Sequence, residues 1–480
     1  MRKTMELFCL LVMSLAVMVG SLSAQERRIV VIQSAAKGAP PSHHALRMTG
    51  PLHRVPPSPK TWSGLGASTS PTLMNTKLAP ATTAAATATT AAATATTSAA
   101  TTAVQSGTTN AVPYFTGSFQ TGYQGGTYTY AMIGQPPQAG GITWIKNEII
   151  PVVVALFNGH NKLLYIFDPT VAHDPQGSDL GLVMQSPIYD PTIRYPGNGS
   201  TLPADTGPFA DTVMRASFIG VRTADWHTLL RPPTVPAVQY VLALQYANGD
   251  WACVGGEAPP CTSIPVVNIA TLFSDFEQIL AIEKPQNSTI PIVLTDYVVA
   301  YDPVSGNCCE VGNHTAITGV VDPTGPLVYV WATFLPQSND PLAPGFEDVS
   351  ILSHELTEAF FNPFLGNTAA PWVDGSVQFP QQTLEPGDVI ERMAAKDAIY
   401  AIPRTPNGVP YTYHVQNEAL LQWFSRTPTA PVTGPGPGVY SWPNTNTLNN
   451  GHNPAGPCGS LAGCWVYGEG PGGFLFGPPY

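Results

Sequence analysis

Six apolar segments in the second and third quarters of the chain have the length and composition of β-strands. They are rich in β-branched and aromatic residues, and Gly, Pro, Asn or Asp lies between them. The six segments are Tyr128–Gly134, Glu148–Phe157, Lys162–Asp168, Tyr240–Tyr246, Ile290–Tyr301 and Pro326–Leu335. Apolar residues at helical spacing are rarer, and they occur in Asp211–Ile219, Phe273–Ile282, Phe346–Phe361 and Glu418–Phe424. The pattern predicts an α+β domain with a mixed or antiparallel sheet.

The segment 25–106 lacks the pattern of a folded domain. Residues 36–80 are rich in Pro, Ser and Gly, and residues 79–103 are almost entirely Ala and Thr. Without larger apolar side chains there is little to bury, so we expect disorder. Composition leaves open whether the segment is a linker, a stalk or a propeptide. Within it, only the run RIVVIQSA at residues 28–35 is strand-like, and the globular domain is expected at 107–480.

Residues 1–24 have the layout of a secretory signal peptide. Arg2 and Lys3 precede an apolar core, Leu7–Val19, and small residues follow at 21–24. The apolar core is too short for a typical membrane span, although a single membrane anchor is the alternative. We therefore expect a protein that is secreted, extracellular or displayed at the cell surface, with the periplasm as a further possibility. No membrane span is expected after the signal is removed.

The cysteines agree with export. Six remain beyond the signal peptide: Cys253, Cys261, Cys308, Cys309, Cys458 and Cys464. An even number in an exported chain indicates disulfides. The first two and the last two each enclose a short loop with Gly or Pro, so we expect each of these pairs to be bonded. The adjacent pair in the middle could bond internally or to distant partners.

Charge excludes several functional classes. Lys and Arg number 20 against 31 Asp and Glu, which gives a net charge of −11. A nucleic-acid partner is not expected, because binding phosphates requires a surplus of cationic groups. The same surplus of acid argues against docking on an anionic membrane surface. The sequence also contains neither a phosphate-binding P-loop motif nor a G-x-S-x-G nucleophile elbow.

The segment Phe346–Phe361 carries the most informative motif, H-E-x-x-E. His354 and Glu358 are four residues apart, so on a helix they project from the same face and can share one divalent cation. Glu355 lies next to His354 and can point at a water on that cation. The motif is that of H-E-x-x-H metallopeptidases with the second His replaced by Glu. Zinc is the expected metal, and another divalent ion is an alternative because carboxylate is a harder ligand.

The helix is expected to have one apolar face, and Glu347 and Asp348 are expected in its first turn, where the helix dipole favours acidic groups. Asn362 and Pro363 end it. The alternative interpretation of the motif is an exposed polar face, in which the His and the second Glu form a simple i,i+4 pair. A strong strand precedes this helix, as a zincin-like core requires.

A third metal ligand is expected from the segment that follows the helix. Glu385 and Asp388 flank Pro386 and Gly387, which impose a turn and can aim both carboxylates into one pocket. The alternative is an exposed acidic turn. Upstream, His314 lies between two strong strands and is a candidate catalytic residue that polarises substrate or stabilises the transition state. The alternative for this residue is an ordinary loop histidine.

These residues resemble the secreted EXORDIUM-like (phosphate-induced) family, and also related bacterial exported proteins of uncharacterised role. The family segment SHELxE…NP…E-I-G-D-x-C is matched here by SHELTEA at 353–359, Asn362-Pro363, Trp372, Glu385, Gly387 and Asp388. The family cysteine is absent, since Val389 and Ile390 follow the aspartate. The resemblance covers residues 290–426. It implies an extracellular protein linked to growth, whose biochemical activity the motif does not settle.

Two functions from different classes follow. The first is a secreted zinc metallopeptidase with a zincin-like core, which acts on an extracellular peptide or protein. In it Glu355 is the catalytic base, and the metal is held by His354 and Glu358 together with Glu385 or Asp388. The second is a non-catalytic extracellular binding protein for a protein or a cell-wall glycan, in which the helix motif is structural. An open metal position in a wide cleft would favour the enzyme, and a closed polar network the binding protein.

Overall fold

The computed structural model describes part of the chain in 15 segments, and all statements below refer to them. They are residues 28–33, 111–120, 126–174, 176–198, 202–254, 256–262, 264–303, 308–321, 325–335, 346–373, 381–390, 395–425, 439–445, 447–448 and 465–466. The described part is a mixed α+β structure composed mostly of strands, as the apolar pattern predicts. The expected signal peptide at 1–24 and most of the expected linker at 25–106 lie outside the described residues.

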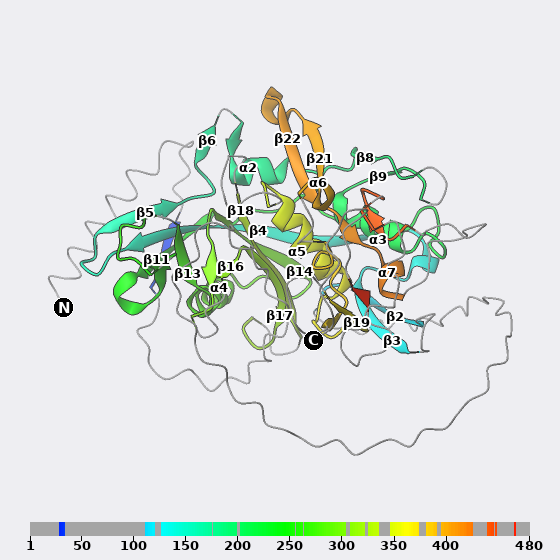
Figure 1. Cartoon of the computed structure of the whole chain (residues 1–480), viewed down its shortest axis with the longest axis horizontal. Helices are drawn as coiled ribbons and strands as arrows, with labels where there is room; N and C mark the ends of the chain where they lie inside the picture. The colour runs from blue at the N-terminus through cyan, green and yellow to red at the C-terminus, as the bar shows by residue number, and fades with distance from the viewer. Residues whose placement is uncertain are drawn as a thin grey trace, which may run out of the picture.

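A mixed sheet organises the fold (Figure 1). Its strand order is β1 (Arg28–Gln33), β11 (Val238–Gln245), β4 (Ile142–Phe157), β14 (Thr289–Asp296), β18 (Leu327–Phe334) and β17 (Gly312–Ile317). Neighbours along this path are parallel, except that β17 runs antiparallel to β18. Two further strands pair with β4, namely β10 (His227–Leu230) in parallel and β5 (Leu163–Phe167) antiparallel. The strand-like run at residues 28–35 is thus β1, at the edge of the sheet.

Both faces of the central strands are buried, because helices cover each side. All eight residues of β18 are buried, which is why this strand has a continuous apolar run instead of an alternating pattern. Val328 and Val330 pack in the same core as helix α5 (Ser350–Phe361), while Tyr329 and Trp331 face the core of helix α4 (Ile269–Glu283). The sheet therefore separates two apolar cores and holds α5 against one of its faces (Figure 1).

Smaller elements surround this framework. The helices are α2 (Asp179–Met184), α3 (Phe209–Ser217), α6 (Ala395–Ala398) and α7 (Leu421–Ser425), with 3-10 turns at Pro137–Ala139, Tyr246–Asn248 and Pro406–Gly408. The hairpins and two-stranded pairs are β2 (Tyr114–Gln120) with β3 (Thr127–Ile133), β6 (Ala172–Asp174) with β7 (Gly177–Ser178), β8 (Arg194–Tyr195) with β9 (Asp205–Thr206), β21 (Ile399–Arg404) with β22 (Tyr411–Gln416), and β23 (Glu418–Ala419) with β24 (Ser441–Trp442). Two small sheets contain β12 (Trp251–Cys253), β13 (Pro265–Asn268), β15 (Ala300–Tyr301) and β16 (Cys308–Glu310), and β20 (Gln381–Thr383), β19 (Thr368–Val373) and β25 (Trp465–Val466).

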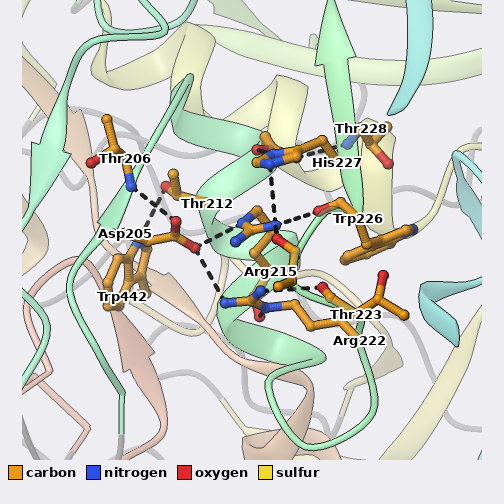
Figure 2. A network of polar contacts seen from close by, with 12 residues as sticks. Asp205, Thr206, Thr212, Arg215, Arg222, Thr223, Trp226, His227, Thr228 and Trp442 are labelled. Atoms are coloured by element: carbon orange, nitrogen blue, oxygen red, sulfur yellow. Dashed lines mark hydrogen bonds and ion pairs between the residues drawn. The ribbon is translucent and has the colours of Figure 1, made fainter. Parts of the chain in front are cut away.

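A polar network fixes α3, which packs against α5 (Figure 2). The Arg215 guanidinium donates from Nε to Asp205 Oδ2 at 2.8 Å, and Arg222 approaches the same oxygen at 3.5 Å. One turn along the same face of the helix, His227 Nδ1 lies 2.7 Å from Asp211 Oδ2, and His227 Nε2 lies 3.4 Å from Arg215 Nη1. Burial raises the pKa of Asp211, while the hydrogen bond from His227 opposes that shift. The network ties α3 to strands β9 and β10, so it supports the core behind α5.

The start of α5 differs from the prediction. The helix begins at Ser350, and Glu347 and Asp348 precede it instead of forming its first turn. Asp348 has a positive φ of 42° and forms an isolated bridge with Leu335, the residue after β18. Its carboxylate accepts from the backbone and the ring of His414 at 2.9 and 2.8 Å. Burial lowers the pKa of His414, but the hydrogen bond and charge of Asp348 outweigh it and leave that pKa raised.

The structure also bears on the predicted disulfides, on one predicted helix and on membrane-spanning helices. The bond between Cys253 and Cys261 is confirmed. Cys309 is also disulfide-bonded, whereas the expected pair Cys458 and Cys464 lies outside the described residues. The predicted helix at residues 418–424 begins as the short strand β23 at Glu418–Ala419, and the helix α7 covers Leu421–Ser425. Within the described segments, no helix has both the length and the apolar character needed to cross a membrane.

Candidate metal centre

Six ionisable side chains that the sequence singles out lie together in the core of the molecule. They come from β17, from α5 and from the segment at residues 385–390, which contains the turn, and each is at most 3% exposed. The six are His314, His354, Glu355, Glu358, Glu385 and Asp388. The interpretations of the motif as an exposed helix face, and of the acidic turn as a surface turn, are therefore wrong.

Helix α5 contributes three of the six, and all twelve of its residues are buried. His354 Nε2 lies 3.2 Å from Glu358 Oε1, one turn along the same face. The same imidazole nitrogen is 3.7 Å from Asp388 Oδ1. Backbone N–H groups of Gly387 and Asp388 donate to Glu358 Oε1 at 3.0 and 3.1 Å. These contacts fix the helix against the turn.

His314 is a strand residue, so the interpretation as a loop histidine is wrong. It belongs to β17, the antiparallel edge of the sheet, and its side chain faces α5. Its Nδ1 lies 3.4 Å from Glu355 Oε2 and 3.5 Å from Glu358 Oε2. Its Nε2 lies 3.6 Å from Glu385 Oε2. The imidazole therefore stands between three carboxylates that come from two different elements.

Two residues that the sequence does not mark as part of the site hold its side chains and turn in place. Asn362, at the end of α5, donates from Nδ2 to Glu385 Oε1 at 2.5 Å, which leaves Oε2 on the side of His314. Gln416 of β22 donates from Nε2 to the Gly387 carbonyl at 2.8 Å. From the sequence, Asn362 and Pro363 predict only the end of the helix, and nothing near Gln416 signals its contact.

Close packing at Gly387 and Gly312 explains why neither position carries a side chain. A Cβ at Gly387 would lie 2.3–2.6 Å from three ring atoms of His354. A Cβ at Gly312 would lie 2.6 Å from both Glu355 Oε1 and Ile351 Cγ2. Each backbone approaches a site side chain more closely than any larger residue would permit. The sequence predicts Gly387 only as a turn former, so its packing role is a structural finding.

The site concentrates negative charge in a region of low polarity. Burial raises the pKa of Glu385 well above its usual range, the charge of Glu358 adds to the shift, and the hydrogen bond from Asn362 opposes it. The imidazoles of His314 and His354 lie within 3.7 Å of these four carboxylates. Buried carboxylates need a cation or protons for compensation.

The donor set and its spacing fit a divalent metal ion such as zinc. Imidazole nitrogen and carboxylate oxygen are both zinc ligands, and bonds of about 2.0–2.2 Å in a tetrahedral site place two ligand atoms about 3.3–3.6 Å apart. The nitrogen–oxygen distances here run from 3.2 to 3.7 Å. Two groups have donor atoms all within 4.8 Å of one another, and Glu358 belongs to both: His314, Glu358 and Glu385; and His354, Glu355 and Glu358.

Tyr411 and Tyr413 belong to the packing of β22. The Tyr413 hydroxyl donates to the Leu182 carbonyl at 2.9 Å, and the two tyrosine rings meet edge to face at 4.8 Å. Burial raises the pKa of Tyr413. Its hydroxyl is engaged in holding α2 to β22.

No family model, curated protein or solved structure matches this chain.

Proposed function

We propose that the chain is a secreted, metal-dependent hydrolase, with zinc as the metal and extracellular peptides or proteins as substrates. The observation that carries the proposal is the geometry of the H-E-x-x-E helix. His354 Nε2 lies 3.2 Å from Glu358 Oε1 and 3.7 Å from Asp388 Oδ1, as ligands of one ion would. A zincin-like core is part of the proposal. The placement of α5 directly after a buried central strand, against a mixed sheet, supports it.

In this proposal each side chain has one role. His354, Glu358 and Asp388 hold the metal, and Glu355, next to the first ligand, is the general base. A bound divalent ion would lower the pKa of a coordinated water and polarise the scissile carbonyl. Glu355 takes the proton from the attacking water and passes it to the leaving amine. Asn362 keeps Glu385 oriented by its hydrogen bond, and Gly387 leaves room for the imidazole of His354.

Sequence features support the proposed location. The signal-peptide layout of residues 1–24 and the resemblance to EXORDIUM-like proteins both favour export. The bond between Cys253 and Cys261 is consistent with an oxidising compartment. The net charge of −11 supports the absence of a nucleic-acid partner.

Glu355→Gln tests the proposal, with Glu347→Gln as the matched control. Both variants remove one carboxylate, but Glu347 precedes the helix and its side chain is partly exposed, at 32%. Zinc content by elemental analysis and cleavage of a mixed peptide library are measured on all three proteins. We expect Glu355→Gln to keep zinc and lose cleavage, and Glu347→Gln to keep both. A Glu355→Gln protein that still cleaves peptides would refute the role of the base. Absence of zinc in the wild-type protein, even after zinc is added back, would refute the hydrolase.

A specific observation favours the second candidate, an extracellular binding protein. The six side chains of the site are at most 3% exposed, which is the closed polar network expected if the motif is structural. In that case the cluster joins β17, α5 and the turn, and the protein binds a protein or a cell-wall glycan elsewhere. Retained glycan or protein binding in the His354→Ala and Glu358→Ala double variant, without zinc in the wild type, would identify this function.

A further inference from the structure

The six buried side chains form two ligand sets instead of one. The first is centred on His354, whose Nε2 lies 3.2 Å from Glu358 Oε1 and 3.7 Å from Asp388 Oδ1, and ligand atoms of His354, Glu355 and Glu358 all lie within 4.8 Å of one another. His314, Glu385 and Glu358 form the second, because one ligand atom of each lies within 4.8 Å of the other two. His314 Nε2 lies 3.6 Å from Glu385 Oε2, and its other nitrogen, Nδ1, lies 3.5 Å from Glu358 Oε2. The two oxygens of Glu358 face opposite sets. One carboxylate thus belongs to both.

Each set has an oriented imidazole and a fixed carboxylate. Glu358 Oε1 is held by the N–H groups of Gly387 and Asp388, and such hydrogen bonds to metal-binding carboxylates are typical of the surroundings of metal sites. In the second set, Asn362 engages Glu385 Oε1 and leaves Oε2 facing His314. Within the described residues, His314 Nε2 and Glu385 Oε2 have no hydrogen-bond partner, although both residues are at most 3% exposed. These two buried atoms lie 3.6 Å apart, and a nitrogen and an oxygen without hydrogen bonds at that spacing are available to bind one ion.

The chemistry of the cluster also suits metal ions. Four carboxylates and two imidazoles are buried there, and both kinds of group bind divalent cations. Carboxylate-bridged pairs of metal ions are a known arrangement for hydrolysis, in which both ions stabilise the reacting oxygens.

We infer that the site binds two divalent cations, bridged by the carboxylate of Glu358. The first ion is held by His354 and Asp388, and the second by His314 and Glu385. The inference rests on the proposed function, because it gives that site a second ion. It reassigns His314 from a catalytic residue to a metal ligand. Glu355 stays the base, and its Oε2 lies 3.4 Å from His314 Nδ1.

Metal stoichiometry tests the inference on the full chain. The protein is stripped with a chelator, dialysed and titrated with Zn²⁺, and bound zinc per folded chain is measured by elemental analysis. We expect two equivalents in the wild type, one in His314→Ala, one in His354→Ala, and a loss of both in Glu358→Gln. His160→Ala removes an exposed turn histidine and should keep two. Circular dichroism establishes that each variant is folded, and His314→Gln replaces His314→Ala if the smaller residue unfolds the core.

The outcomes separate this inference from the proposed function. One equivalent in the wild type, unchanged in folded His314→Ala, would overturn the second ion and leave the hydrolase standing. One equivalent that is lost in His314→Ala and kept in His354→Ala would overturn the two-ion site and the proposed role of His354 together. No zinc in the folded wild type would overturn both proposals.

Discussion

Replacing Gly387 with alanine should disrupt the proposed metal centre through a single added methyl group. The new Cβ would lie 2.3 Å from His354 Nδ1, whereas ordinary contact begins at 3.4 Å, so the imidazole must retreat by about 1.1 Å. The backbone cannot move away instead, because the Gly387 N–H donates to Glu358 Oε1 and its carbonyl accepts from Gln416. A shift of that size moves His354 Nε2 out of the position, 3.2 Å from Glu358 Oε1, in which both atoms could bind one ion.

Two magnitudes follow from this clash. Overpacking of a filled core costs about 1–3 kcal/mol of unfolding free energy, and we expect a loss in that range. Disturbing the surroundings of a metal ligand lowers metal affinity about 10- to 100-fold, and we expect zinc affinity to fall at least as far, because a ligand itself is displaced. Chemical denaturation and zinc titration of the purified protein measure the two effects separately.

Gly366→Ala is the matched control for this prediction. The atom nearest to a Cβ at that position is 3.9 Å away, in ordinary contact, so stability should change by less than about 0.5 kcal/mol and zinc binding should not change. Wild-type zinc affinity and stability in Gly387→Ala would refute the reasoning, since the ring would then have room that the structure does not show.

Three further predictions concern the support of the fold and the site. Asn362→Ala removes the donor to Glu385 Oε1 and should weaken zinc binding about 10- to 100-fold, as zinc titration measures; unchanged affinity would contradict the positioning role. Because the buried Asn362 also accepts from the Asn367 N–H, the variant should lower the unfolding free energy by about 1–3 kcal/mol, as denaturation measures. Replacing Cys253 and Cys261 by serine opens a loop with a sequence separation of 8 and should lower the unfolding free energy by about 2.5 kcal/mol. A shift of the denaturation midpoint measures this loss, and wild-type stability in the variant would contradict it. Burial raises the pKa of Asp275 from 3.8 to about 7, so the native state binds more protons than the unfolded state between these values. The unfolding free energy should therefore fall as the pH rises from about 4 to 7, and this group accounts for up to about 4 kcal/mol of the fall. Asp275→Asn should remove that contribution when denaturation is measured across this pH range. An unchanged pH dependence in the variant would refute the raised pKa of Asp275.

The sequence predicted the elements of the site better than their surroundings. Residues 353–359 identify a helix because apolar residues recur at its spacing, and Pro386 with Gly387 identifies a turn. Both signals are local, so both elements were found. His314 could not be placed on a strand, because Gly312–Ile317 is a short strand with a polar start, and only pairing with β18 defines it.

The start of α5 shows the same limit. Acidic residues before an apolar run are a sound signal for a first turn. Here Asp348 instead accepts hydrogen bonds from His414, which is 66 residues away, and bridges to Leu335. Tertiary contacts of this kind outweigh the local preference, and nothing in the sequence around residue 348 records them. The burial of the whole helix is likewise a consequence of packing, since Ser353 and Thr357 alone give no sign that they are inside.

The long strand β4 has a consequence for how this protein must fold. In register, Val152 pairs with Tyr240, and Ile149 pairs with Ile292, so these contacts close chain loops of 88 and 143 residues. Such non-local pairing slows folding, because the loop entropy is lost before the contact is gained. The framework that supports α5 cannot close until the chain through β14 is available. We therefore expect zinc-competent molecules to appear late in refolding, with the slowest kinetic phase.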